Sequence, residues 1–218
     1  MHKTRLHGKA PDGAPGAISH AFAYELFSAV AFNGTRKRIF GRLVELAEVT
    51  AGDEVLDIGC GPGYLTSLAA DAASPGGHAV GVDVSEPMIA QAQRTRANAH
   101  CSFQLGKAEA LDQADASFDV VVSSLAVHHI PAEARAAAFA EMFRVLRPGG
   151  RVLIADFLPP KGKLGRRLVG ATAGETMRDN PVERIAPMLA DAGFEIRSTT
   201  QVSWFLHCVR ADKPGAAE

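Results

Sequence analysis

Short apolar runs alternate with longer amphipathic segments through the middle of the chain. The runs that predict strands are residues 54–58, 78–84, 102–105, 118–125 and 151–157. The segments that place apolar residues at helical spacing between them are 64–73, 86–98 and 132–146. The run 118–125 is nearly all apolar, which is typical of a parallel strand covered on both faces. This alternation predicts a doubly wound parallel α/β sheet.

The two ends of the chain follow different patterns. Residues 1–34 predict a basic, Gly- and Pro-rich arm, a helix over 17–31 and a turn at Asn33-Gly34. A further helix over 35–49 begins a single domain that we expect to extend to residue 218. Residues 158–180 predict a loop or a short lid helix, and 182–192 a helix. The runs 194–201 and 203–211 predict two strands whose link is too short for a crossover, hence a hairpin.

Composition narrows the class of protein. The chain has 218 residues, of which 47% are hydrophobic, enough to bury the core of one domain. The net charge of −1 gives no support for nucleic-acid binding. No apolar stretch is long enough for a membrane span or placed as a signal peptide. The three cysteines, Cys60, Cys101 and Cys208, have no metal-ligand spacing. We therefore expect a cytoplasmic protein without a metal.

A glycine-rich loop follows the first predicted strand, in the sequence Asp57-Ile-Gly-Cys-Gly-Pro-Gly63. Such a loop lets a ligand approach the backbone at the start of the next helix. Tyr64 stands where a dinucleotide-binding loop would have glycine, and Asp57 would repel phosphates but suits an ammonium group. Asp83 ends the next strand, where a carboxylate can accept hydrogen bonds from both hydroxyls of a ribose. The loop predicts a nucleoside ligand with a cationic end.

Five segments together resemble the motifs of class I S-adenosylmethionine (SAM)-dependent methyltransferases. They are 55–63, 81–85, 106–111 with 117–122, 127–130, and 144–153. The resemblance covers about residues 35–211. It implies a Rossmann-like sheet of seven strands in the order 3-2-1-4-5-7-6, with the last strand antiparallel to its neighbours. It also implies SAM as the methyl donor and S-adenosylhomocysteine as the product.

We expect ten residues to bind the cofactor, of which the resemblance implies Asp57, Gly59, Gly61, Gly63, Asp83, Ala108 and Glu109, and to which we add Cys60, Val84 and Ser124. The glycines and Asp57 would lie at the methionine end of SAM, Asp83 at the ribose, and Ala108 and Glu109 along the adenine. Lys107 stands where the family often has aspartate, and a lysine cannot accept a hydrogen bond from the adenine amino group. We therefore expect backbone groups or Glu109 to recognise adenine, with Lys107 as a surface residue.

Residues near the start of the chain are candidates for a lid. The segments 24–27 and 33–36 are similar to the entry segment of quinone-pathway C-methyltransferases. Tyr24 and Phe27, on the first predicted helix, could close over the cofactor and substrate. The alternative for both side chains is ordinary packing in the core.

Three polar residues at the carboxyl ends of strands are candidates for the chemistry. In an open α/β sheet the ligand lies at this edge, where His128 and His129 follow the fourth strand and Asp156 closes the fifth. A histidine suits proton transfer near neutral pH. A structural role is the alternative, in which the histidines help to start the next helix and Asp156 makes a cap or turn contact.

The favoured function is methyl transfer to carbon, oxygen or nitrogen of a small molecule. The residues after the fourth strand, Ser123-Ser-Leu-Ala126, lack the Asn/Asp-Pro-Pro-aromatic segment that amino-DNA methyltransferases carry. A nucleic-acid methyltransferase is therefore a weaker hypothesis. A non-catalytic binding or scaffold protein of the same fold is a third hypothesis. A fourth is an NAD-binding oxidoreductase, which Asp57 and Tyr64 disfavour.

Overall fold

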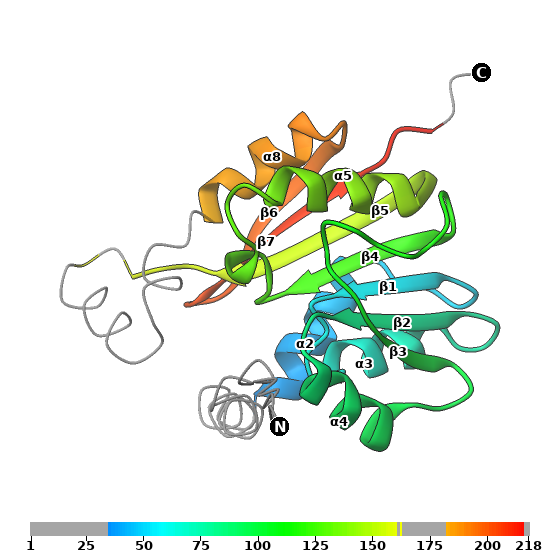
Figure 1. Cartoon of the computed structure of the whole chain (residues 1–218). Helices are drawn as coiled ribbons and strands as arrows, with labels where there is room; N and C mark the ends of the chain where they lie inside the picture. The colour runs from blue at the N-terminus through cyan, green and yellow to red at the C-terminus, as the bar shows by residue number, and fades with distance from the viewer. Residues whose placement is uncertain (1–34, 161, 163–181, 216–218) are drawn as a thin grey trace, which may run out of the picture.

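Seven strands form one mixed sheet at the centre of the fold (Figure 1). The computed structural model describes residues 35–160, 162 and 182–215. The strands are β1 (Glu54–Ile58), β2 (His78–Asp83), β3 (Cys101–Leu105), β4 (Phe118–Ser124), β5 (Leu146–Phe157), β6 (Glu195–Ser203) and β7 (Leu206–Asp212). The expected arm, the helix over 17–31 and the lid candidates Tyr24 and Phe27 lie outside the described residues.

The order of the strands is β3-β2-β1-β4-β5-β7-β6, which confirms the predicted topology. Strands β1 to β5 run parallel to their neighbours, and β7 is antiparallel to both β5 and β6. The hairpin of β6 and β7 is therefore also confirmed. Because the chain order reverses between β1 and β4, the sheet has its topological switch point there.

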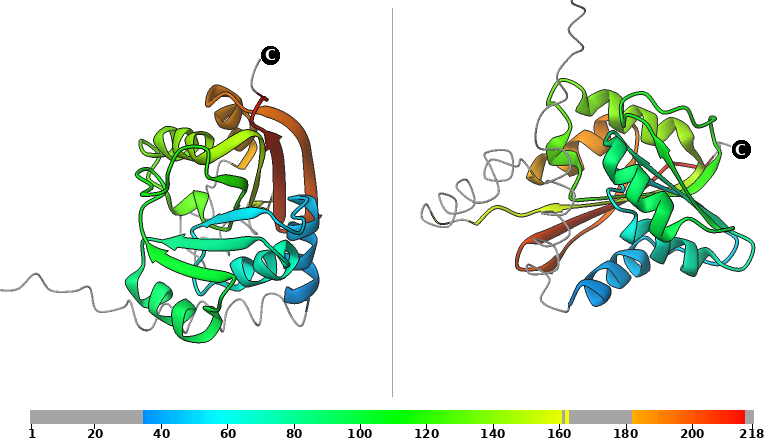
Figure 2. Two further views of the ribbon diagram at one scale, coloured as in Figure 1. Left: turned by 90° about the vertical axis from the view of Figure 1, so that its right-hand side faces the viewer. Right: turned by 60° about the horizontal axis from the view of Figure 1, so that its bottom comes forward.

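Helices cover both faces of the sheet (Figures 1 and 2). They are α2 (Arg36–Leu46), α3 (Tyr64–Ala73), α4 (Glu86–Arg96), α5 (Arg135–Val145) and α8 (Ile185–Asp191), with single 3₁₀ turns η1 (Val127–His129) and η2 (Val182–Arg184). α2, α3 and α4 pack on one face, against Val55 and Val120. α5 and α8 pack on the other, against Leu56 and Val121. Neighbouring residues of one strand thus serve opposite layers, which explains why β1 and β4 are apolar throughout.

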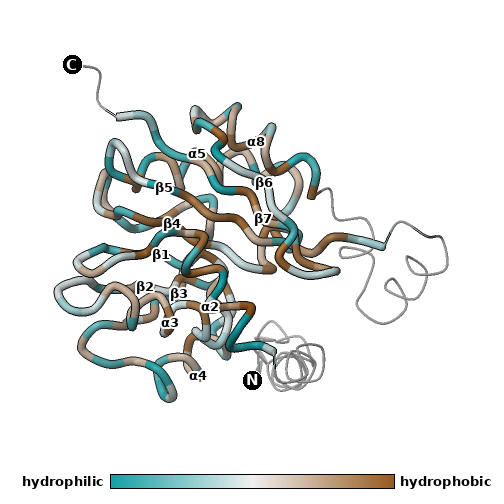
Figure 3. The backbone as a smooth tube through the Cα atoms, turned by 180° about the vertical axis from the view of Figure 1, so that it is seen from behind, coloured by the Kyte–Doolittle hydropathy of each residue, from teal (hydrophilic) through white to brown (hydrophobic). Residues whose placement is uncertain are grey.

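Hydropathy follows these layers along the backbone (Figure 3). The central strands β4 and β5 are mostly hydrophobic, whereas β6, at the edge of the sheet, is largely hydrophilic. Polar side chains on an exposed edge strand disfavour pairing with another chain.

The structure corrects two boundaries. β5 begins at Leu146, five residues before the prediction, because Leu146 pairs with Phe118 at the start of β4. Gly149 and Gly150, which follow, hydrogen-bond to Lys213. Ser203 belongs to β6 rather than to the last strand, so the hairpin turns at Trp204 and Phe205. The connection from β3 to β4, residues 106–117, contains no helix.

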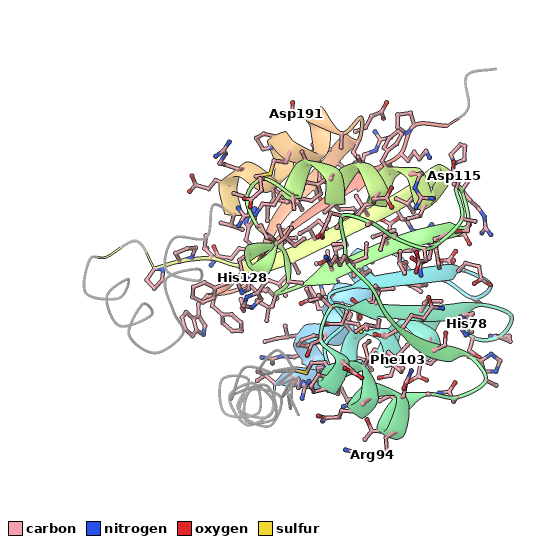
Figure 4. All side chains as sticks on the ribbon, viewed as in Figure 1. His78, Arg94, Phe103, Asp115, His128 and Asp191 are labelled. Carbon is pink, nitrogen blue, oxygen red and sulfur yellow. The ribbon has the colours of Figure 1, made fainter. Side chains whose placement is uncertain are left out.

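The carboxyl ends of β1, β2, β4 and β5 lie at one edge of the sheet, which we call the carboxyl edge. Figure 4 shows His128 at this edge, with His78 and Asp115 at the opposite end. The turn of the β6–β7 hairpin also lies at the carboxyl edge, because Leu206 pairs with Phe157, the last residue of β5. Trp204 in that turn is 75% exposed and contacts the ring of Phe205.

Candidate active site

A cleft of about 420 Å³ opens at the carboxyl edge, and we call it the main cleft. Its volume lies within the range of small-ligand pockets. Residues at the ends of four strands line it, among them Gly59 and Gly61 after β1, Asp83 at the end of β2, and His129 after β4. The main cleft therefore lies at the topological switch point, where open α/β sheets bind their ligands.

The glycine loop forms one wall of the main cleft. Gly59, Gly61 and Gly63 all have positive φ angles, of 72°, 52° and 81°, which favour glycine over any residue with a side chain. A Cβ atom on Gly59 would overlap the side chain of Ala126, and one on Gly63 would overlap the ring of Phe103. A Cβ on Gly61 would meet no atom within 4 Å. Gly61 thus leaves space for a ligand, whereas Gly63 packs against the protein interior.

Asp83 fixes the loop and also faces the main cleft. Its Oδ2 accepts a hydrogen bond from the backbone N–H of Gly61 at 2.8 Å, and its Oδ1 accepts one from that of Ser85 at 2.8 Å. Each oxygen of a carboxylate can accept a second hydrogen bond. The carboxylate is therefore oriented by the backbone and still able to bind a pair of hydroxyls.

A second and much smaller cavity, of about 20 Å³, which we call the inner cavity, is also lined by Gly59. The residues that line it include Arg36, Asp57, Cys60, Tyr64 and Ser124. Because Gly59 lines both spaces, the main cleft and the inner cavity meet at the glycine loop.

Asp57 is a buried carboxyl group at the inner cavity, with only 1% of its surface exposed. Its Oδ2 accepts a hydrogen bond from the hydroxyl of Thr66 on α3 at 2.6 Å. Burial raises the pKa of Asp57 to about 7, the Thr66 hydrogen bond opposes this rise, and the charge of Asp83 adds to it. A cation in the inner cavity would favour the ionised form of Asp57.

Cys60 and Ser124 complete the inner cavity. Burial raises the pKa of the Cys60 thiol, which therefore stays protonated and is no nucleophile. The hydroxyl of Ser124, at the end of β4, is buried and has no hydrogen-bond partner among the described residues. A buried polar atom without a partner is unfavourable, so a ligand that bonds to this hydroxyl would be stabilised.

The segment that follows β3 forms the far wall of the main cleft, through Lys107, Ala108 and Glu109. Arg144 of α5 holds this segment in place, because its guanidinium donates hydrogen bonds to the carbonyls of Leu111 and Gln113 at 3.0 and 2.7 Å. Lys107 lines the main cleft but is exposed. Val84, which also lines the main cleft, is 70% exposed although it is apolar. A flat apolar ligand would cover Val84.

His128 and Asp156 form a buried pair beneath the main cleft. Nδ1 of His128 lies 2.6 Å from Oδ1 of Asp156, and Oδ2 of Asp156 accepts a hydrogen bond from the backbone N–H of His128 at 3.0 Å. The backbone N–H of Phe157 also donates to Oδ1, at 2.7 Å. Asp156 thus receives three contacts, and the two that come from His128 fix both the position and the ring orientation of that histidine.

His129 lines the main cleft, and its ring lies 4.1 Å from that of His128. Partial removal from water, followed by the neighbouring His128, lowers the pKa of His129 to about 4. The ring is therefore neutral at pH 7 and can accept a hydrogen bond from a ligand. The sequence predicts both histidines near a ligand, but only His129 faces the main cleft.

The structure brings most of the predicted cofactor residues together. Gly59, Gly61, Asp83, Val84, Ala108 and Glu109 line the main cleft, while Asp57, Cys60 and Ser124 line the inner cavity. Gly63 lines neither. Arg36 and Arg144 are site residues that the sequence does not predict, although Arg36 lies in the segment 33–36. Both residues reach the site through contacts with residues that are far from them in the sequence.

Two features are absent from the part of the chain that the structure describes. No group of three or more His, Cys, Asp or Glu side chains there could hold a metal ion. Among the same residues, no helix has the length and the apolar character needed to cross a bilayer.

Comparison with known proteins gives related sequences. Residues 55–150 match the family described as "Methyltransferase domain". An arsenite methyltransferase from Halobacterium salinarum is 37% identical in an alignment of 158 positions that covers 68% of this chain and 39% of that protein. The ubiquinone/menaquinone biosynthesis C-methyltransferase UbiE from Rubrivivax gelatinosus is 30% identical in an alignment of 218 positions that covers 90% of this chain and 84% of that protein. The chain thus spans well under half of the first relative and most of the second.

Solved structures share the fold at lower identity. A SAM-dependent methyltransferase from Aquifex aeolicus has a TM-score of 0.70 at 16% identity, covering 83% of this chain and 93% of that one. The [4+2]-cyclase SpnF has a TM-score of 0.65 at 21% identity, covering 81% of each chain. Since one fold appears with different reactions, the fold alone does not define the chemistry.

Proposed function

The chain belongs to the family of SAM-dependent methyltransferases, and on this premise we propose that it transfers a methyl group from SAM to a small-molecule acceptor bound in the main cleft. When bound, SAM supplies a methyl group on a positively charged sulfur, and its transfer to a nucleophile leaves S-adenosylhomocysteine. The protein then has to orient the two reactants and exclude water. The observation that carries the proposal is the pair of adjoining spaces on the two sides of the glycine loop.

The main cleft suits the adenosine part of SAM. Asp83 would accept hydrogen bonds from the two ribose hydroxyls, because each of its oxygens keeps a free acceptor position. Val84 would lie against the adenine ring, which would explain its exposure. Glu109 and the backbone of Ala108 would contact the edge of the adenine. Lys107 would then remain at the surface, as expected from the sequence.

The inner cavity suits the amino-acid end of SAM. Asp57 would receive the ammonium group, whose charge favours the ionised carboxylate. The hydroxyl of Ser124 would find a partner there. Gly59 and Gly61 would let the ligand pass close to the backbone, with Cys60 beside it, and Gly63 would act through the shape of the loop.

His129 would contact the acceptor from the rim of the main cleft. Because its ring is neutral at pH 7, it can accept a hydrogen bond from a hydroxyl or another weakly acidic group on the acceptor. His128 and Asp156 act beneath it, where Asp156 orients His128 and the two histidine rings lie against each other. We assign Asp156 a positioning role. An acceptor that presents a hydrogen-bond donor to the neutral ring of His129 fits this arrangement best.

The names of the relatives suggest which acceptors to test. They include arsenite, demethylmenaquinone and phosphoethanolamine. The relative from Rubrivivax, which shares most of its length with this chain, is a C-methyltransferase of quinone biosynthesis. A phenol hydroxyl could donate a hydrogen bond to the neutral ring of His129, so we propose phenolic compounds as the first acceptor class.

Calorimetric titration of the full chain with SAM, S-adenosylhomocysteine and NAD tests the cofactor. We expect micromolar binding of both sulfur compounds and none of NAD. Incubation with methyl-labelled SAM and separate panels of quinols, arsenite, phosphoethanolamine, RNA and DNA then tests the acceptor. Transfer to a small molecule supports the proposal, and transfer to RNA or DNA alone overturns it. Binding of SAM without transfer to any acceptor would favour the scaffold hypothesis.

A further inference from the structure

Arg36 introduces a positive charge at the inner cavity. It is the first residue of α2 and lines the cavity together with Asp57 and Ser124. Its guanidinium carbon lies 4.1 Å from the centre of the Tyr64 ring, which also lines the cavity. Stacking on an aromatic face holds a guanidinium in place while leaving its N–H groups able to donate.

The guanidinium of Arg36 has a buried donor without a partner. Its Nε makes no hydrogen bond to any of the described residues. Within that part of the chain no carboxylate lies within ion-pair distance of it, although many arginines there are paired. An arginine keeps its charge at any pH at which proteins fold, and it offers five N–H donors and no acceptor. A buried and unpaired donor of this kind is unfavourable unless a ligand supplies the acceptor.

Asp57 does not serve as this partner. Its carboxyl group bonds to Thr66 on α3 and is not within ion-pair distance of Arg36. The inner cavity therefore presents one acidic and one basic group that are not paired with each other. A ligand that carries both charges on neighbouring atoms, as the zwitterion of an α-amino acid does, would match both groups at once.

We propose that Arg36 binds the α-carboxylate at the methionine end of SAM, opposite Asp57, and that it selects ligands that carry this carboxylate. The inference rests on the proposed function, because it places SAM in the inner cavity. It adds a residue outside the glycine loop and outside the motifs between residues 55 and 153. It also assigns a role to the start of α2, whose first turn contains no acidic residue.

A comparison of two ligands distinguishes carboxylate binding by Arg36 from simple packing of Arg36 on Tyr64. The two ligands are S-adenosylhomocysteine and its decarboxylated analogue, which keeps the amine and loses only the carboxylate. Wild-type protein is expected to bind S-adenosylhomocysteine about 10- to 100-fold more tightly, the range of a charge-assisted hydrogen bond. In Arg36→Gln this preference should fall to about threefold or less, while the affinity for the decarboxylated analogue stays within about twofold of wild type.

Two further variants are the controls. Arg36→Lys keeps the charge but not the planar set of N–H donors, so it should retain part of the preference. Arg38→Gln removes a positive charge from an exposed position on the same helix and should leave the preference unchanged. Thermal unfolding of each variant checks that the fold is intact.

The outcomes differ between this inference and the proposed function. If Arg36→Gln weakens the binding of both ligands equally, or of neither, Arg36 does not bind the carboxylate, and the proposed function stands. If wild-type protein binds S-adenosylhomocysteine no better than the decarboxylated analogue, the inference is likewise overturned. If wild-type protein binds neither ligand, the proposed function falls and the inference falls with it.

Discussion

Nδ1 of His128 and Oδ1 of Asp156 are 2.6 Å apart, and the two side chains are 2% and 0% exposed. Such a pair fixes which ring nitrogen of the histidine carries the proton. The neighbouring ring of His129 lines the main cleft. The ring orientation in the floor of the candidate site therefore depends on a carboxylate that no ligand reaches.

Replacing Asp156 with asparagine is expected to lower kcat by about 100-fold, the cost of misplacing a group in a site, because His128 would lose the carboxylate that orients its ring against His129. The affinity for S-adenosylhomocysteine should change less than twofold, since Asp156 lines neither the main cleft nor the inner cavity. Steady-state kinetics and calorimetry measure the two quantities. The double variant with His128→Gln should lose no more activity than the worse single variant, and additive losses would mean that the two residues act separately.

Replacing Asp83 with asparagine is expected to weaken the binding of S-adenosylhomocysteine by about 10- to 100-fold, because the charged acceptor for the ribose hydroxyls becomes a neutral amide. The 2′-deoxyribose analogue should lose much less affinity through the same substitution. Calorimetric titration of both ligands gives the comparison. Equal losses for the two ligands would indicate that Asp83 acts only by holding the backbone N–H groups of Gly61 and Ser85.

The affinity for S-adenosylhomocysteine should rise as the pH increases from about 5 to 7 and then level off. Burial places the pKa of Asp57 in the empty protein at about 7, and an ammonium group in the inner cavity would lower it. Binding below pH 7 therefore releases a proton. Titration in buffers of different ionisation enthalpy detects that proton. In Asp57→Asn the pH slope should disappear, and a slope that persists would assign the proton to a different group.

The same pKa sets the sign of a stability effect in the empty protein. Between about pH 4 and 7 the folded chain holds a proton on Asp57 that the unfolded chain has lost. The contribution of Asp57 to the free energy of unfolding is thus present at low pH and is lost as the pH rises through 7. Denaturant unfolding of wild type and Asp57→Asn should show a steeper loss with rising pH in the wild type.

Two glycine substitutions should separate fold from binding. Gly63→Ala should destabilise the protein by about 1–3 kcal/mol, since the new methyl group would overlap the Phe103 ring. Gly61→Ala should cost only about 1 kcal/mol, for its positive φ angle, but should weaken S-adenosylhomocysteine strongly because the methyl group points into open space. Thermal unfolding and calorimetry test both. Gly61→Ala with unchanged affinity would show that the ligand does not approach this atom.

The parts of the fold that could be predicted are those that depend on residues adjacent in the sequence. β1 and β4 are apolar on both faces because each serves two helical layers, as Val55 and Leu56 illustrate. The loop from Asp57 to Gly63 combines an acidic residue with three glycines that need positive φ angles. Local sequence was sufficient for both.

The remaining features depend on contacts between distant residues. β5 extends back to Leu146 through its pairing with Phe118 of β4, and Gly149 and Gly150 hydrogen-bond to Lys213, more than sixty positions later. Arg144 reaches back to the carbonyls of Leu111 and Gln113, and Arg36 reaches the inner cavity from the start of α2. None of these contacts has a periodic or motif signal in the sequence.

The turn of the β6–β7 hairpin gives the protein an internal optical reporter. The chain contains one tryptophan, and this residue, Trp204, is exposed in a turn at the carboxyl edge. Its fluorescence therefore comes from one place, close to the end of β5 and to Asp156. An emission change on adding an acceptor, compared between the protein alone and the protein saturated with S-adenosylhomocysteine, would show whether the acceptor needs the first ligand in order to bind, with no label attached to either.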